Sequence, residues 1–245
     1  MSNASTGECL IKVSQMNKVF RLGKLEIHAL RDINLEVYDG EYLSIMGPSG
    51  SGKSTLFNMI GALDVPTSGE VDVSGVDLTK LTSRQLAYFR GNYIGYVFQS
   101  YNLIYAYSAI ENVALPLIFS GVPLEDARKK AEETLHRVGL GHRVTHRPDE
   151  LSGGQQQRVA IARALANDPL IILADEPTAN LDIHTGQEII HLMAELSEER
   201  GVTVISATHD HKMLAQSDRI LWIKDGTVDR IDTDPKGSVK VGSIR

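Results

Sequence analysis

The sequence has one cysteine, Cys9, among its 245 residues. A single cysteine excludes an internal disulfide and any metal site built from several cysteines. The chain also lacks a run of roughly 20 apolar residues, the length that a membrane-spanning helix needs. Its first residues, MSNASTGECL, contain no basic segment leading into an apolar core, as a secretory signal would. We therefore expect a chain that is neither exported nor inserted in a membrane by itself, which leaves a subunit of a membrane assembly open.

The sequence has fewer basic than acidic residues, 25 Lys and Arg against 31 Asp and Glu, which gives a net charge of −6. A chain of this sign binds polyanions poorly through bulk charge, and we expect no nucleic acid partner. The hydrophobic fraction of 42% and the charged fraction of 23% are ordinary for a globular protein. The length is sufficient for one large domain or two small ones with a sizeable core.

Short β-rich runs alternate with longer helical patterns, which predicts an α/β fold with a mostly parallel sheet. About the first 45 residues are strand-rich, with a turn near Leu22-Gly23-Lys24, and predict an antiparallel sheet beside the core. Residues 100–152 contain several helical patterns without a convincing strand, and predict a helical insertion. We expect one domain over residues 10–232, with loose ends at 1–9 and 233–245. The β-rich runs are 33–37, 42–46, 93–98, 170–174, 202–206 and 220–223, and the helical patterns are 53–63, 108–119, 124–138, 154–167, 184–199 and 210–216.

A glycine-rich loop, GPSGSGKST at 47–55, follows the apolar run 42–46 and precedes a helical pattern. Glycines let successive backbone N–H groups surround phosphate oxygens, and the start of the helix adds positive partial charge. The Lys53 ammonium would reach the β- and γ-phosphates, and the Ser54 hydroxyl would ligate Mg²⁺. The alternative, a turn that happens to precede Lys-Ser, is disfavoured by the strand and the helix around it. We assign ATP binding to Gly47, Pro48, Ser49, Gly50, Ser51, Gly52, Lys53, Ser54 and Thr55.

Two carboxylates, Asp175 and Glu176, follow the apolar run 170–174. Because ligands bind at the carboxyl ends of parallel strands, both side chains should emerge near the phosphates. Asp175 suits a Mg²⁺ anchor acting through water, and Glu176 suits the group that orients and deprotonates the attacking water. The alternative is an acidic turn that caps the following helix.

A second glycine motif, LSGGQ at 151–155, precedes another helical pattern, with Ser152 as a good N-cap. With the phosphate loop and the acidic pair on either side of this motif, the sequence resembles the ATP-binding subunits of ABC transporters over nearly its whole length. Gln99 matches the Q-loop of that family, Asn180-Leu181-Asp182 matches the D-loop, and His209 matches the switch histidine. The resemblance implies a P-loop NTPase core of the ABC type.

The resemblance also implies a mechanism with two copies of the chain. Lys53 of one copy and Ser152, Gly153, Gly154 and Gln155 of the other would hold the same ATP. Gln99 would touch Mg²⁺ and the attacking water while starting the helical insertion. His209 would bind the γ-phosphate and position Glu176, and Asp182 would support the opposite site. Phe20 stands where the family commonly has a tyrosine that stacks on adenine, and a phenyl ring can still stack.

Within the superfamily, stretches such as IMGPSGSGKST, GYVFQSYNLI and ILADEPTANLD look like the MacB/LolD/FtsE-type group. This implies an ATPase that lies at the cytoplasmic face of the inner (plasma) membrane. It would drive a separate permease in lipoprotein release or efflux, with a groove around 98–107 and 115–119 for a short helix of that partner. The alternative is an FtsE-like module that transmits force without transport. ATPases of DNA repair are disfavoured, because the span from Gln99 to Ser152 is too short for a long coiled coil.

Overall fold

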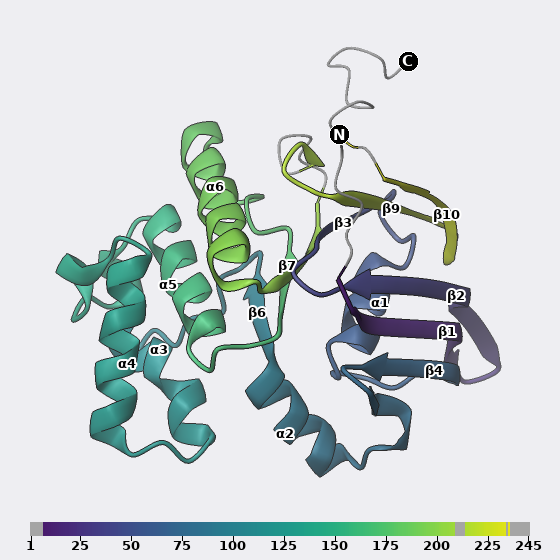
Figure 1. Cartoon of the computed structure of the whole chain (residues 1–245), viewed down its shortest axis with the longest axis horizontal. Helices are drawn as coiled ribbons and strands as arrows, with labels where there is room; N and C mark the ends of the chain where they lie inside the picture. Colours follow the sequence, from purple (N-terminus) through teal and green to yellow (C-terminus); the bar gives the residue numbers. More distant parts are fainter. Residues whose placement is uncertain (1–6, 209–213, 234, 236–245) are drawn as a thin grey trace.

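A computed structural model describes residues 7–208, 214–233 and 235. Their larger sheet has the strand order β10-β9-β3-β8-β7-β6, in which all neighbours are parallel except β10, which is antiparallel to β9 (Figure 1). Every residue of β3 and β8 is buried, as expected for central parallel strands. The predicted α/β fold is confirmed. The strands are β3 Tyr42–Met46, β6 Ile94–Phe98, β7 Ile171–Asp175, β8 Thr203–Ala207, β9 Arg219–Lys224 and β10 Thr227–Asp232.

The predicted antiparallel sheet near the N-terminus is also present, with the strand order β2-β1-β4-β5. Its first two strands turn at Gly23, whose φ of 63° favours glycine. Helix α1, Lys53–Ile60, shares one hydrophobic cluster with strands of both sheets. The strands are β1 Cys9–Leu22, β2 Leu25–Tyr38, β4 Ser68–Val73 and β5 Val76–Asp77.

Helices α3 and α4 lie within the predicted helical insertion at 100–152, and α5 begins directly after it. These three helices, the helical part, pack together on the other side of β6 and β7 from α1 (Figure 1). None of the helices in the described ranges combines the length and the apolar character that crossing a bilayer requires. The predicted helix at 210–216 lies mostly outside the described residues. The helices here are α3 Ala109–Phe119, α4 Leu124–Arg137, α5 Gly153–Leu165 and α6 Ile183–Arg200, with short 3₁₀ turns at Leu78–Lys80, Gly141–Arg143 and Pro148–Glu150.

Helix α2, Ser83–Tyr93, was not predicted from the sequence. Only Leu86 and Phe89 of this helix are buried, so it lacks the apolar stripe that identifies an amphipathic helix. Its start is instead fixed by a capping box, in which Thr82 and Gln85 bond to each other's backbone N–H groups.

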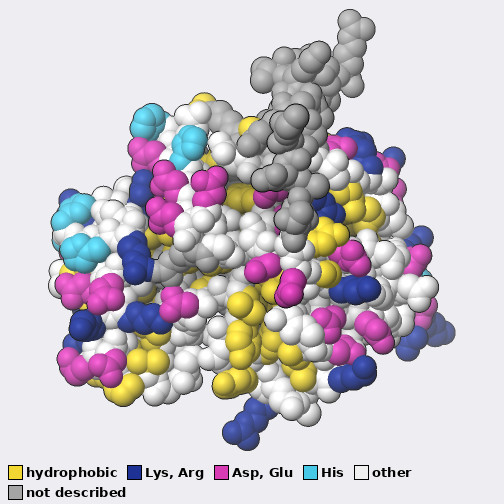
Figure 2. Space-filling model, in the orientation of Figure 1, with side chains coloured by type: hydrophobic (Ala, Val, Ile, Leu, Met, Phe, Trp, Pro, Cys, Tyr) yellow, Lys and Arg dark blue, Asp and Glu magenta, His cyan; other side chains and the backbone are white. Residues whose placement is uncertain are grey.

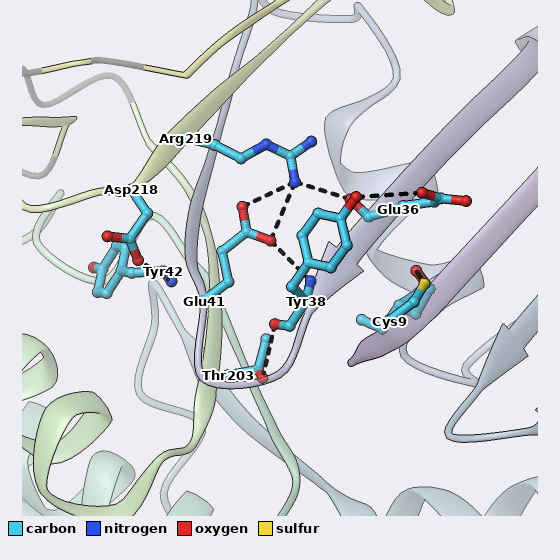
Figure 3. Close-up of polar contacts among 9 residues, drawn as sticks. Cys9, Glu36, Tyr38, Glu41, Tyr42, Thr203, Asp218 and Arg219 are labelled. Atoms are coloured by element: carbon cyan, nitrogen blue, oxygen red, sulfur yellow. Dashed lines mark hydrogen bonds and ion pairs between the residues drawn. The ribbon is translucent and has the colours of Figure 1, made fainter. Parts of the chain in front are cut away.

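Glu41 places a buried carboxylate between β2, β3 and β9 (Figure 3). Its two oxygens accept hydrogen bonds from Arg219 Nη1 at 3.1 and 3.2 Å, and Oε2 also accepts from the Tyr38 N–H. Nη1 of Arg219 donates to the Glu36 carbonyl as well, so the guanidinium joins β9 to β2. Burial raises the pKa of Glu41 above its ordinary value of 4.5, and the Tyr38 N–H and Arg219 oppose this shift.

Replacing Arg219 by alanine is expected to lower the free energy of unfolding by about 2–3 kcal/mol, because the buried carboxylate loses its cation. With a raised pKa, folded Glu41 binds more protons than it does in the unfolded chain, so stability is full below pH 4.5 and falls as pH rises through the folded-state pKa. Without Arg219 this pKa rises further. The loss should therefore be larger at about pH 8 than at about pH 5.

Urea unfolding at the two pH values measures the effect of Arg219→Ala. The matched control is Arg21→Ala, since Arg21 pairs with Glu26 at 3.0 Å but is 77% exposed. The control should leave the midpoint nearly unchanged, as exposed pairs contribute little. An equal loss at both pH values for Arg219→Ala would contradict the role given to the Glu41 carboxylate.

Candidate nucleotide-binding site

A cavity of about 470 Å³ lies at the start of α1. The phosphate loop and the first turn of α1 form one wall, and Asp175 and Glu176 at the end of β7 form another. Strand β2 and the Asp225–Gly226 turn between β9 and β10 complete it. The two motifs that the sequence separates by about 120 positions are thus brought into one cavity.

The phosphate loop is held in a shape that requires glycine. Gly50 and Gly52 have φ angles of 77° and 109°, which side chains disfavour. A Cβ on Gly52 would lie 2.8 Å from the carbonyl oxygen of Ala29 on β2, so this position has no room for a side chain either. The N–H of Gly226 donates to the Ser51 carbonyl at 2.9 Å. These contacts fix the loop between β2 and the β9–β10 turn.

Lys53 is 8% exposed, and its Nζ donates to the carbonyls of Gly47 at 2.7 Å and Pro48 at 3.0 Å. Burial lowers the pKa of Lys53, and the negative charges of Glu176 and Asp175 oppose this shift. Burial and the charge of Glu176 raise the pKa of Asp175, which Lys53 opposes. The Lys53 ammonium and the loop N–H groups suit a phosphate anion. The two carboxylates suit a metal cation that is bound to that phosphate.

The pairing of the parallel strands explains why separate motifs meet here. Phe98 of β6 lies opposite Asp175 of β7, which in turn lies opposite Ala207 of β8. The N–H of Glu176 donates to the Ala207 carbonyl at 2.9 Å, one residue beyond the strand. Gln99 directly follows Phe98, so it leaves the sheet at the same edge as the acidic pair. The pairing of β6 with β7 therefore places Gln99 at the same edge of the sheet as Asp175 and Glu176.

Glu176 has a φ of 46°, a left-handed conformation that is uncommon for a residue with a side chain. Backbone strain of this kind is concentrated at functional sites. His209, the predicted partner of Glu176, lies outside the described residues.

The donors predicted for Mg²⁺ are Ser54, Gln99 and Asp175, and the first and last of these line the cavity. A hydroxyl, a carboxylate and an amide oxygen fit Mg²⁺, which takes few protein ligands and keeps waters and phosphate oxygens. Within residues 7–208, 214–233 and 235, no cluster of three or more His, Cys, Asp or Glu side chains forms a dedicated metal cage.

Phe20, predicted to stack on adenine, lies beside the cavity and does not line it. Its cross-strand partner is Ile27, which does line the cavity. The Phe20 ring is 41% exposed, and Nζ of Lys18 lies 5.1 Å from its centre. An exposed ring at the rim is placed where a base could lie flat on it.

Several residues of the cavity wall were not predicted from the sequence. These come from β2 and from the β9–β10 turn, neither of which carries a phosphate-binding motif. The Asp225-Gly226 pair between two β-rich runs is a hairpin signal, which would have predicted the turn without placing it beside the phosphate loop. The missed residues are Ile27, His28, Ala29, Arg31, Asp225 and Gly226.

The LSGGQ motif begins α5 and lies outside this cavity. Ser152 caps the helix: its Oγ accepts from the Gln155 N–H at 3.4 Å, and Gln155 Oε1 accepts from the Ser152 N–H at 3.0 Å. Ser152 is exposed, whereas Gly154 is buried where a side chain would clash with Thr185 of α6. The motif is thus a rigid helix start that this chain's own phosphate loop does not use.

Asp182 caps another helix, α6. Its carboxylate accepts from the N–H groups of His184 and Thr185, both at 3.1 Å, and the bonds from Thr185 and His184 lower the pKa of Asp182. Two residues earlier, Asn180 donates from Nδ2 to the Gln99 carbonyl at 2.9 Å. The segment 180–182 therefore joins the Q-loop to α6 within one chain, and its role at an opposite site stays a prediction.

Comparison with known proteins identifies close relatives. An uncharacterized ABC transporter ATP-binding protein of Thermotoga maritima is 51% identical over 215 residues, which are 88% of this chain and 92% of the relative. The lipoprotein-releasing system ATP-binding protein LolD of Syntrophus aciditrophicus is 45% identical over 89% of this chain and 98% of its own. The macrolide export ATP-binding/permease protein MacB of Aggregatibacter actinomycetemcomitans is 44% identical over 96% of this chain, which spans 37% of that longer protein.

A solved structure of similar shape is the dimeric ATP-binding cassette of Methanocaldococcus jannaschii in a post-hydrolysis state bound to ADP and Pi. It is 47% identical, has a TM-score of 0.84, and the match covers 91% of this chain and 98% of that one. Residues 30–179 also match the family described as ABC transporter. The chain therefore belongs to the ABC transporter family, as one of its ATP-binding and ATP-hydrolysing cassettes.

Proposed function

We propose that residues 10–232 form one nucleotide-binding domain that binds ATP with Mg²⁺, pairs with a second copy and drives a separate membrane permease of the MacB/LolD type. The observation that carries this proposal is the 470 Å³ cavity in which the phosphate loop faces Asp175 and Glu176. One side can hold a triphosphate, and the other can hold Mg²⁺ and activate water. These are the two requirements for hydrolysis.

Each group in the cavity has a separate task. Lys53 and the loop N–H groups bind the phosphates, since both are hydrogen-bond donors that the loop holds in place. Ser54, Gln99 and Asp175 hold Mg²⁺, which offsets the phosphate charge when it is bound. Glu176 orients the attacking water and takes its proton.

The remaining predicted residues complete the nucleotide site. Phe20 supplies the ring on which the adenine stacks. His209 donates a hydrogen bond to the γ-phosphate and positions Glu176. Both roles follow the family resemblance, and the location of Phe20 beside Ile27 at the cavity rim supports the first.

Ser152–Gln155 of one copy bind the ATP held by Lys53 of the other. The exposed Ser152 supports this, because it begins a helix, a position suited to anion binding, and does not line the cavity of its own chain. Asp182 assists the opposite site from the start of α6. Since each copy recognises the γ-phosphate on the other, loss of that phosphate removes the preference for the closed pair and lets the copies separate.

The permease is proposed to be a separate chain, as the LolD relative is named as an ATP-binding protein and the MacB relative as both ATP-binding protein and permease. This chain spans 37% of the MacB relative, which leaves the greater part of that protein for other functions. We place the pair at the cytoplasmic face of the inner (plasma) membrane, as a peripheral component. The transported substrate would be a lipoprotein released from the membrane or a compound moved by efflux.

A groove of about 320 Å³ provides a docking place for the permease. Residues of α2, β6, α3 and α5 line it, so it lies between the sheet and the helical part. Figure 2 shows hydrophobic side chains exposed near the junction of α2 and β6. Tyr105 and Phe119, from the two segments predicted to contact a partner helix, are 64% and 83% exposed. Phe98, Asn102 and Pro116 of the same two segments line the groove. Exposed apolar side chains on segments that line a groove fit a short amphipathic helix of the permease.

Replacing Ser152 by arginine tests the pairing. ATP binding should survive, because Ser152 lies outside the cavity of its own chain. ATP-dependent dimer formation and hydrolysis should fall at least about tenfold, since a large side chain would then stand between the two copies. Calorimetric titration measures binding, gel filtration with ATP measures pairing, and phosphate release measures hydrolysis.

Thr82→Arg is the matched control, because Thr82 is also an exposed N-cap with a capping box, at the start of α2. It should cost a similar amount of helix stability and leave pairing and hydrolysis intact. Unchanged hydrolysis in Ser152→Arg would remove the LSGGQ motif from the site and refute the two-copy arrangement.

A further inference from the structure

Tyr101 and Asn102, the second and third residues after Gln99, have left-handed backbone conformations. Tyr101 has a φ of 59° and Asn102 a φ of 49°. Asparagine tolerates this conformation, but tyrosine adopts it only where its surroundings enforce it. The N–H of Asn102 donates to the Ser100 carbonyl at 2.6 Å, which makes the turn tight. The Q-loop segment, residues 99–102, is therefore a strained turn that needs an external support.

Arg163 gives that support from the last turn of α5. Its Nη2 donates to the Tyr101 carbonyl at 2.8 Å, and its Nη1 donates to the Asn102 carbonyl at 2.5 Å. Burial lowers the pKa of Arg163, and no ion pair of this residue is found in the part of the chain that the structure describes. A guanidinium held by two backbone carbonyls, with no carboxylate, is placed to fix a backbone shape rather than to form a salt bridge.

The other end of α5 also contacts this segment. A Cβ on Gly153, in the first turn of α5, would lie 2.9 Å from the Tyr101 hydroxyl. The Tyr101 side chain thus lies on the LSGGQ motif while its carbonyl is held by Arg163, at the opposite end of the same 13-residue helix. On the other side, Asn180 holds the Gln99 carbonyl. The Q-loop segment and the LSGGQ motif are joined as one unit.

We propose that Arg163 is a positioning residue that keeps Tyr101 and Asn102 left-handed, and so places Gln99 and the LSGGQ motif together. The inference rests on the proposed function, in which Gln99 serves the nucleotide of its own copy and the LSGGQ motif serves the nucleotide of the other. Through Arg163 the two nucleotide sites of a pair become mechanically linked. Arg163 also lines the 320 Å³ groove, so a partner docked there would contact the same support.

The test compares Arg163→Ala and Arg163→Lys with the unchanged chain, at varied ATP and varied Mg²⁺. In Arg163→Ala, kcat should fall roughly 10- to 100-fold, as expected when a reacting group is displaced. The Mg²⁺ concentration for half-maximal rate should rise several-fold, because Gln99 no longer meets the metal correctly. The affinity for ATP without Mg²⁺ should stay nearly constant, since the phosphate loop is untouched. Arg163→Lys should lie between the two, because an ammonium can retain one of the two carbonyl bonds.

Arg158→Ala is the matched control on the same helix. Arg158 also donates to a backbone carbonyl, that of Val138 at 3.1 Å, and pairs with Glu188 at 2.9 Å, but it has no bond to the Q-loop segment. It should leave kcat and the Mg²⁺ requirement unchanged. Thermal unfolding of each variant shows whether it folds, and Arg163→Lys carries the test if Arg163→Ala does not fold.

The inference is overturned if an Arg163 variant that folds keeps the Mg²⁺ requirement of the unchanged chain, or if Arg158→Ala shifts it equally. Failure of the proposed function would look different. In that case the unchanged chain would not hydrolyse ATP, or Ser152→Arg would hydrolyse it normally, whatever Arg163 does.

Discussion

Replacing Glu176 by glutamine is expected to leave ATP bound and to lower its hydrolysis roughly 10²- to 10⁴-fold, the range for loss of a general base. Glutamine has nearly the same shape, so the hydrogen bond from the residue 176 N–H to the Ala207 carbonyl should persist. The amide cannot take a proton from water. Removing one of two adjacent negative charges also lessens repulsion toward the triphosphate, so ATP-bound pairs should accumulate.

Gel filtration with ATP and Mg²⁺ measures this accumulation, and phosphate release measures the turnover. Glu188→Gln is a matched control, because Glu188 is a half-exposed glutamate on α6 that pairs with Arg158 and does not line the cavity. It should hydrolyse ATP normally and show no trapped pair. A Glu176→Gln chain that stays monomeric and turns over at the normal rate would contradict the assignment of Glu176 as the base.

The parts of the site that the sequence predicted are those whose geometry is local. The phosphate loop takes its shape from consecutive residues, with glycines where φ is positive and a helix directly behind. Asp175 and Glu176 were predicted because they directly follow a short apolar strand, and ligands bind at the carboxyl ends of parallel strands. Such features need no knowledge of distant parts of the chain.

The cavity wall from β2 depends on contacts that no short pattern records. The pairing of β1 with β2 is regular from the Gly23 turn back to Phe20 and Ile27, so this pair follows from the turn. The close approach of Gly52 to the Ala29 carbonyl on β2 is a tertiary contact, which counting along the hairpin does not give. Arg163 supports Tyr101 and Asn102 from about 60 positions further along the chain. It bonds to their backbone carbonyls, which every residue type has, so the sequence does not indicate this contact. Helix α2 was also missed from the sequence, because a capping box rather than an apolar stripe marks it.

Replacing Lys53 by alanine is expected to weaken ATP binding roughly 10- to 100-fold, which corresponds to loss of charged hydrogen bonds of about 1.5–3 kcal/mol. Lys53 is the lysine that lines the cavity, and it is held there by the carbonyls of Gly47 and Pro48. Without it, Asp175 and Glu176 would face the triphosphate without the Lys53 ammonium that opposes their charge. Hydrolysis should fall by more than binding, since an ammonium at the γ-phosphate also offsets charge that develops in the transition state.

Calorimetric titration with ATP and Mg²⁺ measures the affinity, and Lys80→Ala is the control, because Lys80 pairs with Asp77 on the exposed surface away from the cavity. The control should bind ATP normally. Glu176→Gln and Lys53→Ala then separate the two halves of the site: the first should bind without hydrolysing, whereas the second should fail at binding. An unchanged affinity in Lys53→Ala would mean that the loop N–H groups alone hold the phosphates, and it would remove the lysine from the site.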